Sequence, residues 1–130
     1  MRILGFLFSH IKKNKIVSHR DIVQRIYDAT HGGLYIILWV CPQTSECVGV
    51  NGKKYFKMHD GNTPSARLLQ RKSDKYGNIW GVMDYSGEGW RSAIDLYMEE
   101  HRFSQDRFND ALRQIAKHFN IPLNKEGGAL

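Results

Sequence analysis

The sequence predicts an α+β domain with a small antiparallel sheet, flanked by an N-terminal helix and two C-terminal helices. Three observations support this fold class: a helical apolar pattern near residue 20, a middle section of short strand-like runs separated by turn residues, and two amphipathic segments after residue 90. Helices and strands that are segregated along the chain are typical of α+β domains. The length of 130 residues suits one domain with a substantial core.

The first helix is predicted over residues 19–31, where apolar side chains at positions 22, 23, 26, 27 and 29 form a stripe at helical spacing. Ser18 is suited to the N-cap and Gly32 to the end of this helix. We therefore expect a single domain over residues 19–122. Residues 1–18 would form an arm or a short helix before it, and residues 123–130 a tail after it.

The middle of the chain predicts the strands. Residues 34–41 (LYIILWVC) are apolar throughout, five of the eight are β-branched or aromatic, and Pro42 follows them, which predicts a strand buried on both faces. Further strands are expected over residues 48–50, 53–57, 66–72 and 79–85. Residues 59–65 (HDGNTPS) predict a corner between two of them, and residues 73–78 predict a turn between the last two.

Residues 86–89 (SGEG) interrupt the strand pattern, and from Trp90 onward the pattern becomes helical. Apolar residues at 93, 94, 97 and 98 predict a helix that ends near residue 101. Ser104 is expected to cap a second helix, in which apolar residues recur at positions 108, 111, 112, 115, 116 and 119. Pro122 lies just beyond its expected end.

The net charge of +6 comes from two blocks. Residues 1–20 carry five basic side chains and no acid, and residues 53–75 carry seven basic and two acidic side chains. Clustered positive charge favours polyanionic partners such as nucleic acid. The alternative is that lysines on a strand only keep a sheet edge soluble.

Several classes of protein do not fit the sequence. No apolar run approaches the roughly 20 residues that span a bilayer, and the basic cluster at residues 12–15 follows the short apolar start instead of preceding it, so we expect a cytoplasmic protein without a membrane partner. Cys41 and Cys47 are too few for a disulfide scaffold, and we expect reduced thiols. The sequence contains no P-loop, dinucleotide fingerprint or hydrolase elbow.

Several motifs together resemble the zinc-binding N-terminal domain of bacterial-type DNA primases. These are His59-x3-Thr63-Pro64-Ser65, then strands, a glycine-rich turn, the run Ala93–Glu100 and the run Ala111–Ala116. Asp21-Ile22-Val23 is similar to the start of the family's first helix. The resemblance covers roughly residues 19–119, and it implies a zinc-ribbon-like fold that contacts single-stranded template DNA beside a separate polymerase core.

The departures from this family concern the metal. The alignment places Phe56, Asp84 and Gly87 where the family has cysteine ligands, so His59 alone is retained, and a structural zinc site needs four ligands. We therefore expect a degenerate ribbon without metal or other cofactor. Packing of the aromatic residues 55, 56, 80, 85 and 90 would replace the ion. A rearranged site that uses Cys41 and Cys47 with His59 remains open.

The resulting hypothesis is a non-catalytic module that binds single-stranded DNA in the replication or mobilisation of a mobile element. Cations interleaved with aromatic rings suit this role, and the expected binding residues are Lys53, Lys54, Tyr55, Lys57, Arg67, Arg71, Lys72, Lys75 and Tyr76. His59 is expected to brace its turn.

Two alternatives stay open. One is an adaptor that docks on a replication or host protein through its acidic helical half. The other is a small metal-dependent nuclease that uses Asp60, Asp84 and Glu88. The sequence does not decide between DNA and RNA, nor the oligomeric state.

Overall fold

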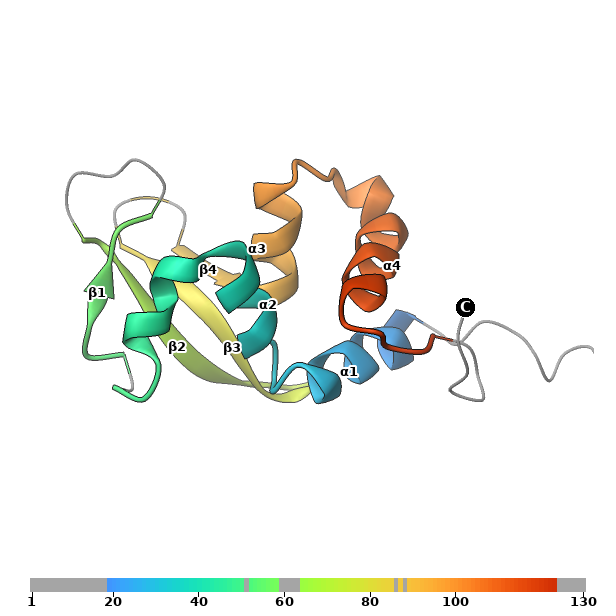
Figure 1. The fold of residues 1–130 in the computed structure, drawn as a ribbon, viewed down its shortest axis with the longest axis horizontal. Coiled ribbons are helices and arrows are strands. Elements are labelled where there is room, and N and C mark those ends of the chain that lie inside the picture. The colour runs from blue at the N-terminus through green and yellow to red at the C-terminus, as the bar shows by residue number, and fades with distance from the viewer. Residues whose placement is uncertain (1–18, 51, 59–63, 86, 88, 124–130) are drawn as a thin grey trace, which may run out of the picture.

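The computed structural model describes residues 19–50, 52–58, 64–85, 87 and 89–123 (Figure 1). Residues 59–63 of the expected corner at 59–65, the arm at 1–18 and most of the tail lie outside these residues. The elements in chain order are α1 (His19–Ala29), α2 (Leu34–Val40), the 3₁₀ helix η2 (Pro42–Cys47), β1 (Tyr55–Phe56), β2 (Ala66–Ser73), β3 (Gly77–Asp84), β4 (Gly89–Ser92), α3 (Ala93–Glu100), the 3₁₀ helix η3 (Gln105–Arg107) and α4 (Phe108–His118). This order of helices and strands confirms the predicted α+β class.

The sheet is an antiparallel meander with the strand order β1-β2-β3-β4. Its longest part is the β2–β3 hairpin, in which Ala66 is paired with Asp84 and Ser73 with Gly77. At the turn, the Ser73 hydroxyl accepts hydrogen bonds from the backbone N–H groups of Lys75 and Tyr76, at 3.1 and 3.2 Å. The strands predicted at 66–72 and 79–85 and the turn between them are confirmed to within two residues.

The two faces of the sheet differ because side chains alternate along each strand. Ala66, Leu68 and Val82 belong to the inner face, and all three are fully buried. Arg91 of β4 is also an inner-face residue, and its guanidinium pairs with Glu99 of α3, which shows that α3 covers this face. Figure 1 places the sheet at one end of the molecule, α1 and α4 at the other, and α2 and α3 between them.

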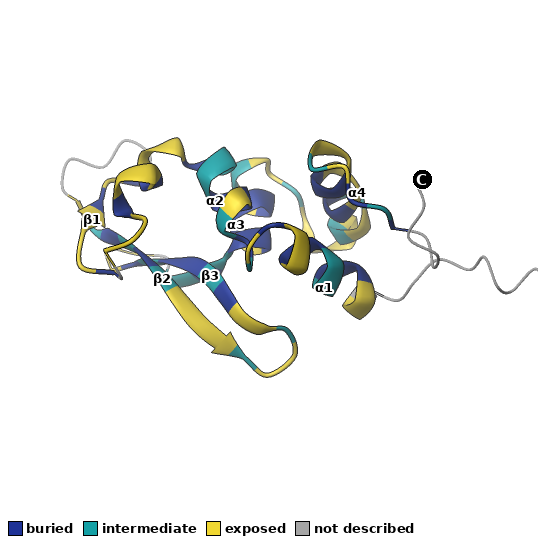
Figure 2. Cartoon of the chain, turned by 60° about the horizontal axis from the view of Figure 1, so that its bottom comes forward, coloured by how far each residue is buried: buried dark blue, intermediate teal, exposed yellow. Residues whose placement is uncertain are grey.

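The core is one continuous cluster that joins the inner face of the sheet to all four α-helices. Its members include Ile26 of α1, Ile36 of α2, Leu96 of α3 and Ile115 of α4, each with no exposed surface. Figure 2 shows that the turn end of the β2–β3 hairpin is largely exposed, although Tyr76 of the turn packs against the core. No helix in the described part of the chain has the length and apolar character needed to cross a membrane.

The prediction of a buried strand at residues 34–41 was wrong, because Leu34–Val40 form α2. His31, Gly32 and Gly33 all have left-handed φ values (54°, 66° and 93°), and they turn the chain directly from α1 into α2. Ile36 and Ile37 are then buried in the core. A short, continuously apolar run fits a buried strand and a buried helix equally well, and here the tight turn and the packing decide for the helix.

The remaining strand predictions need smaller corrections. Residues 48–50 form no strand, and the strand expected at 53–57 is reduced to the two residues of β1. Conversely, Gly89–Ser92 form β4, where the sequence predicted a break followed by a helix from Trp90. The helix begins at Ala93, and the Ser92 side chain caps it by accepting a hydrogen bond from the N–H of Asp95 at 3.3 Å. Ser104 lies at the N-cap position of η3, which leads into α4.

Candidate nucleic-acid interface

One row of side chains crosses the outer face of all four strands. The register pairs Tyr55 of β1 with Arg67 of β2, Arg67 with Met83 of β3, and Met83 with Trp90 of β4. None of these four side chains is fully buried. The outer face therefore presents a strip of aromatic, cationic and thioether groups beside solvent, which we call the outer strip.

Arg67 is held at the centre of this strip. Its guanidinium carbon lies 5.4 Å from the ring centroid of Tyr55 and 5.8 Å from that of Tyr85. Its Nη1 donates to the Tyr85 hydroxyl at 3.3 Å, and its Nε donates to the carbonyl oxygen of Gly52. The rings on either side remain accessible, since Tyr55 is 46% and Tyr85 is 57% exposed. The cation is thus fixed in position without a carboxylate among these contacts.

A second arginine lies on a second ring. The Arg71 guanidinium carbon lies 4.3 Å from the ring centroid of Trp90, which is cation–π geometry. The indole leans over Gly81, where a Cβ atom would come within 2.4–2.5 Å of the ring. Glycine at position 81 therefore makes room for Trp90 to lie along the sheet and reach Arg71.

The nine residues predicted from the sequence are only partly brought together. Tyr55, Arg67 and Arg71 share the outer face, as their register and ring contacts show. Lys53 is exposed and follows Gly52, whose backbone lies against Leu69 and Arg67, so Lys53 is at the rim of this face. Lys72 alternates with Arg71 along β2 and so lies on the opposite side of the hairpin.

The other predicted lysines lie at the periphery of the outer face. Lys54 forms an exposed ion pair with Glu46 at 2.9 Å, which raises the pKa of Lys54 and lowers that of Glu46. Lys57 is exposed just after β1, and Lys75 is exposed in the hairpin turn. These positions add positive potential around the face without contacting its rings.

Two expectations about aromatic residues were wrong. Tyr76 was expected to be exposed, but it is half-buried against Tyr27 of α1, with ring centroids 5.6 Å apart. Tyr85 was expected to pack in place of a metal, yet it is exposed, and only Phe56 of that aromatic group is fully buried. Tyr55, which was also named as a binding residue, is exposed as that role requires. The hairpin register, which places Tyr85 and Trp90 on the same face as Arg67, was the missing information.

The acidic and thiol residues give no second site in the described chain. Cys41 and Cys47 are buried free thiols, and burial raises the pKa of Cys41 to about 11. Asp84 accepts a hydrogen bond from the Ser65 hydroxyl at 3.1 Å. No group of three or more metal-ligating side chains occurs among the described residues. The rearranged metal site depends on His59 and the nuclease site on Asp60 and Glu88, and these three residues lie outside the described ones.

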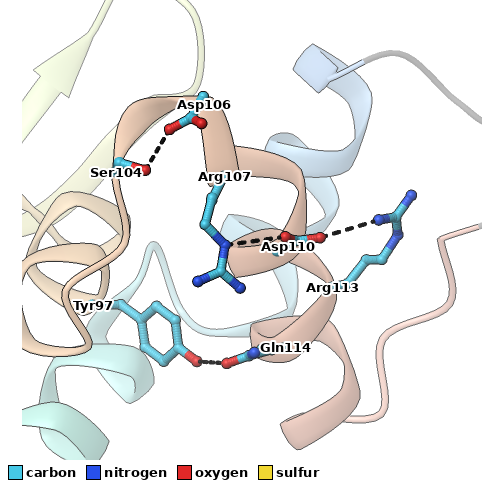
Figure 3. A network of polar contacts seen from close by, with 7 residues as sticks. All are labelled: Tyr97, Ser104, Asp106, Arg107, Asp110, Arg113 and Gln114. Carbon is cyan, nitrogen blue, oxygen red and sulfur yellow. Dashed lines mark hydrogen bonds and ion pairs between the residues drawn. The ribbon is translucent and has the colours of Figure 1, made fainter.

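Acids of the helical half are engaged within the chain. Asp110 pairs with Arg107 at 3.3 Å and with Arg113 at 3.5 Å, and Asp106 accepts a hydrogen bond from the Ser104 hydroxyl (Figure 3). The same view shows the Tyr97 hydroxyl donating to Gln114 at 2.8 Å, which links α3 to α4. Glu99 is bound to Arg91. An acidic docking surface on these helices would have to compete with these internal contacts.

Comparisons with known proteins add no relative. No family model matches the sequence, and neither the curated proteins nor the solved structures contain a match.

Proposed function

We propose that this chain is a non-catalytic module that binds single-stranded nucleic acid on the outer face of its sheet. The observation that carries the proposal is the outer strip with its flanking residues: Arg67 and Arg71 lie on aromatic rings of the outer sheet face, where Tyr55 and Tyr85 are exposed. Both guanidinium groups lie on the outer face, which also carries the accessible rings of Tyr55 and Tyr85. This combination suits a ligand that offers phosphates and unpaired bases.

Two contributions to the binding free energy add up when a single strand binds such a face. Each phosphate that pairs with a cation releases condensed counterions, and each unpaired base that stacks on an aromatic ring contributes about 1–3 kcal/mol. A duplex keeps its bases stacked on one another, so it can use only the first contribution. We therefore propose single strands as the preferred ligand.

The choice of DNA, and of a role in the replication or mobilisation of a mobile element, is supported only by the resemblance to primase zinc-binding domains. The proposal also includes no bound metal and no catalysis. The groups that meet on the outer strip and beside it at Arg71 are guanidinium groups, aromatic rings and a thioether, and these do not pair a nucleophile with a general base.

Fluorescence anisotropy with a labelled oligothymidylate across a salt series tests the proposal. Two to four phosphate contacts would make log K fall against log salt with a slope of about −1.4 to −2.8, at about 0.7 per contact on single strands. Arg67→Gln should weaken binding about tenfold, the size expected when one charge-assisted contact is lost. Lys117→Gln, on the exposed side of α4, is the matched control and should leave affinity unchanged.

Absence of binding at low salt, or a slope near zero, would overturn the proposal. Equal losses in the Arg67 and Lys117 variants would mean that the outer strip is not the binding surface. Reversing the charges of Arg67 and Arg71 also separates this function from a protein adaptor, because only nucleic-acid binding should then be lost.

A further inference from the structure

The two arginines of the outer face are held in different ways. Arg67 donates hydrogen bonds to Gly52 and Tyr85 and lies against two tyrosine rings. The contact described for Arg71 is its stack on Trp90, at 4.3 Å from the ring centroid. Arg71 is also exposed, whereas Arg67 is half-buried. Moving the Arg67 side chain would break two hydrogen bonds and two ring contacts, whereas moving Arg71 would break one weak ring contact.

The position that Arg71 occupies on the indole is the position that a stacked base would take. The Trp90 ring already lies over Gly81, where not even a methyl group would fit beneath it. A planar ligand that stacks on the indole face covered by Arg71 must displace the guanidinium. Because base–aromatic stacking is stronger than an exposed cation–π contact, this exchange is favourable.

We propose that Arg71 is a displaceable cap on a base-stacking position formed by Trp90, whereas Arg67 is a fixed phosphate contact. This inference rests on the proposed function and specifies how the same face selects its ligand. An unpaired nucleobase replaces the Arg71 guanidinium on the indole, and the released guanidinium pairs with a neighbouring phosphate. Binding of a phosphate chain without bases leaves Arg71 on Trp90.

The spacing of the two arginines suits this division. They are four residues apart on β2, which at about 3.3 Å per residue separates them by roughly 13 Å. A short single-stranded segment can therefore contact Arg67 through its backbone while one of its bases reaches Trp90. The ligand class is a short stretch of unpaired nucleotides, and bare polyphosphate should be a poor substitute.

The test follows the indole N–H resonances of the full chain by NMR, with the Trp90 signal assigned by its loss in Trp90→Phe. Oligothymidylate, an abasic oligonucleotide of the same length and inorganic polyphosphate are the three probes. We expect oligothymidylate to shift the Trp90 signal, and the two probes without bases to bind more weakly and leave it in place. An oligouridylate arm separates RNA from DNA, and a Trp90 shift with either sugar supports the proposal.

Two variants sharpen the test without disturbing the core. Arg71→Ala should make Trp90 more accessible to acrylamide quenching in the free protein and reduce the salt slope by about 0.7, with less than a threefold change in affinity. Arg67→Ala should lower affinity about tenfold and leave the quenching of Trp90 unchanged. Trp39→Phe, at a tryptophan that packs on His118 and Tyr97, is the matched control and should not change oligonucleotide affinity.

The outcomes distinguish the inference from the function on which it rests. Oligothymidylate binding with an unmoved Trp90 signal would overturn the displaceable cap and leave the proposed function standing. Equal Trp90 shifts with oligothymidylate and polyphosphate would also overturn it, because no base would then be needed. Absence of binding to every probe would overturn both proposals.

Discussion

The two faces of the sheet differ in the groups that contact their arginine side chains. On the inner face, Arg91 is only 7% exposed and its guanidinium is paired with the Glu99 carboxylate. On the outer face, Arg67 and Arg71 lie on aromatic rings. A buried cation needs an anion to offset its desolvation, whereas a cation at the surface can pack on a ring and keep its charge available. The comparison shows that the inner face neutralises its buried cation with a carboxylate, whereas the outer face holds its cations on aromatic rings near the surface.

The largest effect should come from the packing difference between the faces. Leu68 is fully buried on the inner face, and Leu69 is half-buried on the outer face beside Gly52. Leu68→Ala should lower the free energy of unfolding by about 3 kcal/mol through lost transfer energy and cavity formation. Leu69→Ala, one residue away, should cost clearly less. Urea denaturation of both variants checks this, and equal losses would contradict the assignment of the two faces.

Removing the carboxylate that pairs with the inner-face arginine should have an intermediate effect. Glu99→Gln takes the charge partner from Arg91, and we expect a loss of about 1–2 kcal/mol, less than for a fully buried pair because Glu99 is partly exposed. Asp110→Asn, in an exposed helix pair, is the control and should change stability by less than about 0.5 kcal/mol. Thermal unfolding measures both, and an unchanged Glu99→Gln midpoint would show that the pair is not needed to bury Arg91.

The core beneath the inner face should also respond to pH. Burial raises the pKa of the Cys41 thiol from 9.0 to about 11, so the folded chain keeps this proton at pH values where the unfolded chain loses it. Its contribution to stability is therefore complete below pH 9 and is lost as pH rises from 9 to about 11. Comparing the pH dependence of unfolding with that of Cys41→Ala checks this. Curves that stay parallel over this range would contradict it.

The smallest effect is expected at the rim of the outer face. Lys54 and Glu46 form an ion pair that is exposed to solvent, and exposed pairs contribute little to stability. Lys54→Gln should leave the unfolding midpoint unchanged and should weaken oligonucleotide binding less than Arg67→Gln does. A larger loss of binding in the Lys54 variant would move the centre of the interface from the strip to its rim.

Elements with a sustained period could be predicted from the sequence. The α4 stripe repeats over eleven residues, and the β2–β3 hairpin joins two eight-residue strands through a turn rich in Ser, Asp, Gly and Asn. The run Leu34–Val40 has no period to read, since all its residues are apolar, and its helical form depends on the Gly32-Gly33 turn and on burial. Strand β4 is short and lies directly before a helix, so its residues from Trp90 onward were predicted as part of that helix.

The sequence predicts the positive charge of the candidate site, but it does not predict how the side chains are arranged on the sheet. The cations of residues 53–75 are visible in the sequence, and the pairing of Tyr55 with Arg67 follows once the register is known. Tyr85 and Trp90 lie on this face and Lys72 lies on the other one. These positions depend on the register and the side-chain alternation of β2, β3 and β4. Tyr76 was misjudged because its partner, Tyr27, comes from a helix about 50 residues earlier in the chain.

The meander order of the sheet has a consequence for how the chain folds. Every strand is paired with its neighbour along the chain, so each pairing closes a short loop and loses little conformational entropy. Proteins dominated by such local contacts fold quickly. We expect the β2–β3 hairpin to be structured in the rate-limiting step, with the docking of α1 on α4, at the far ends of the described chain, completed afterwards.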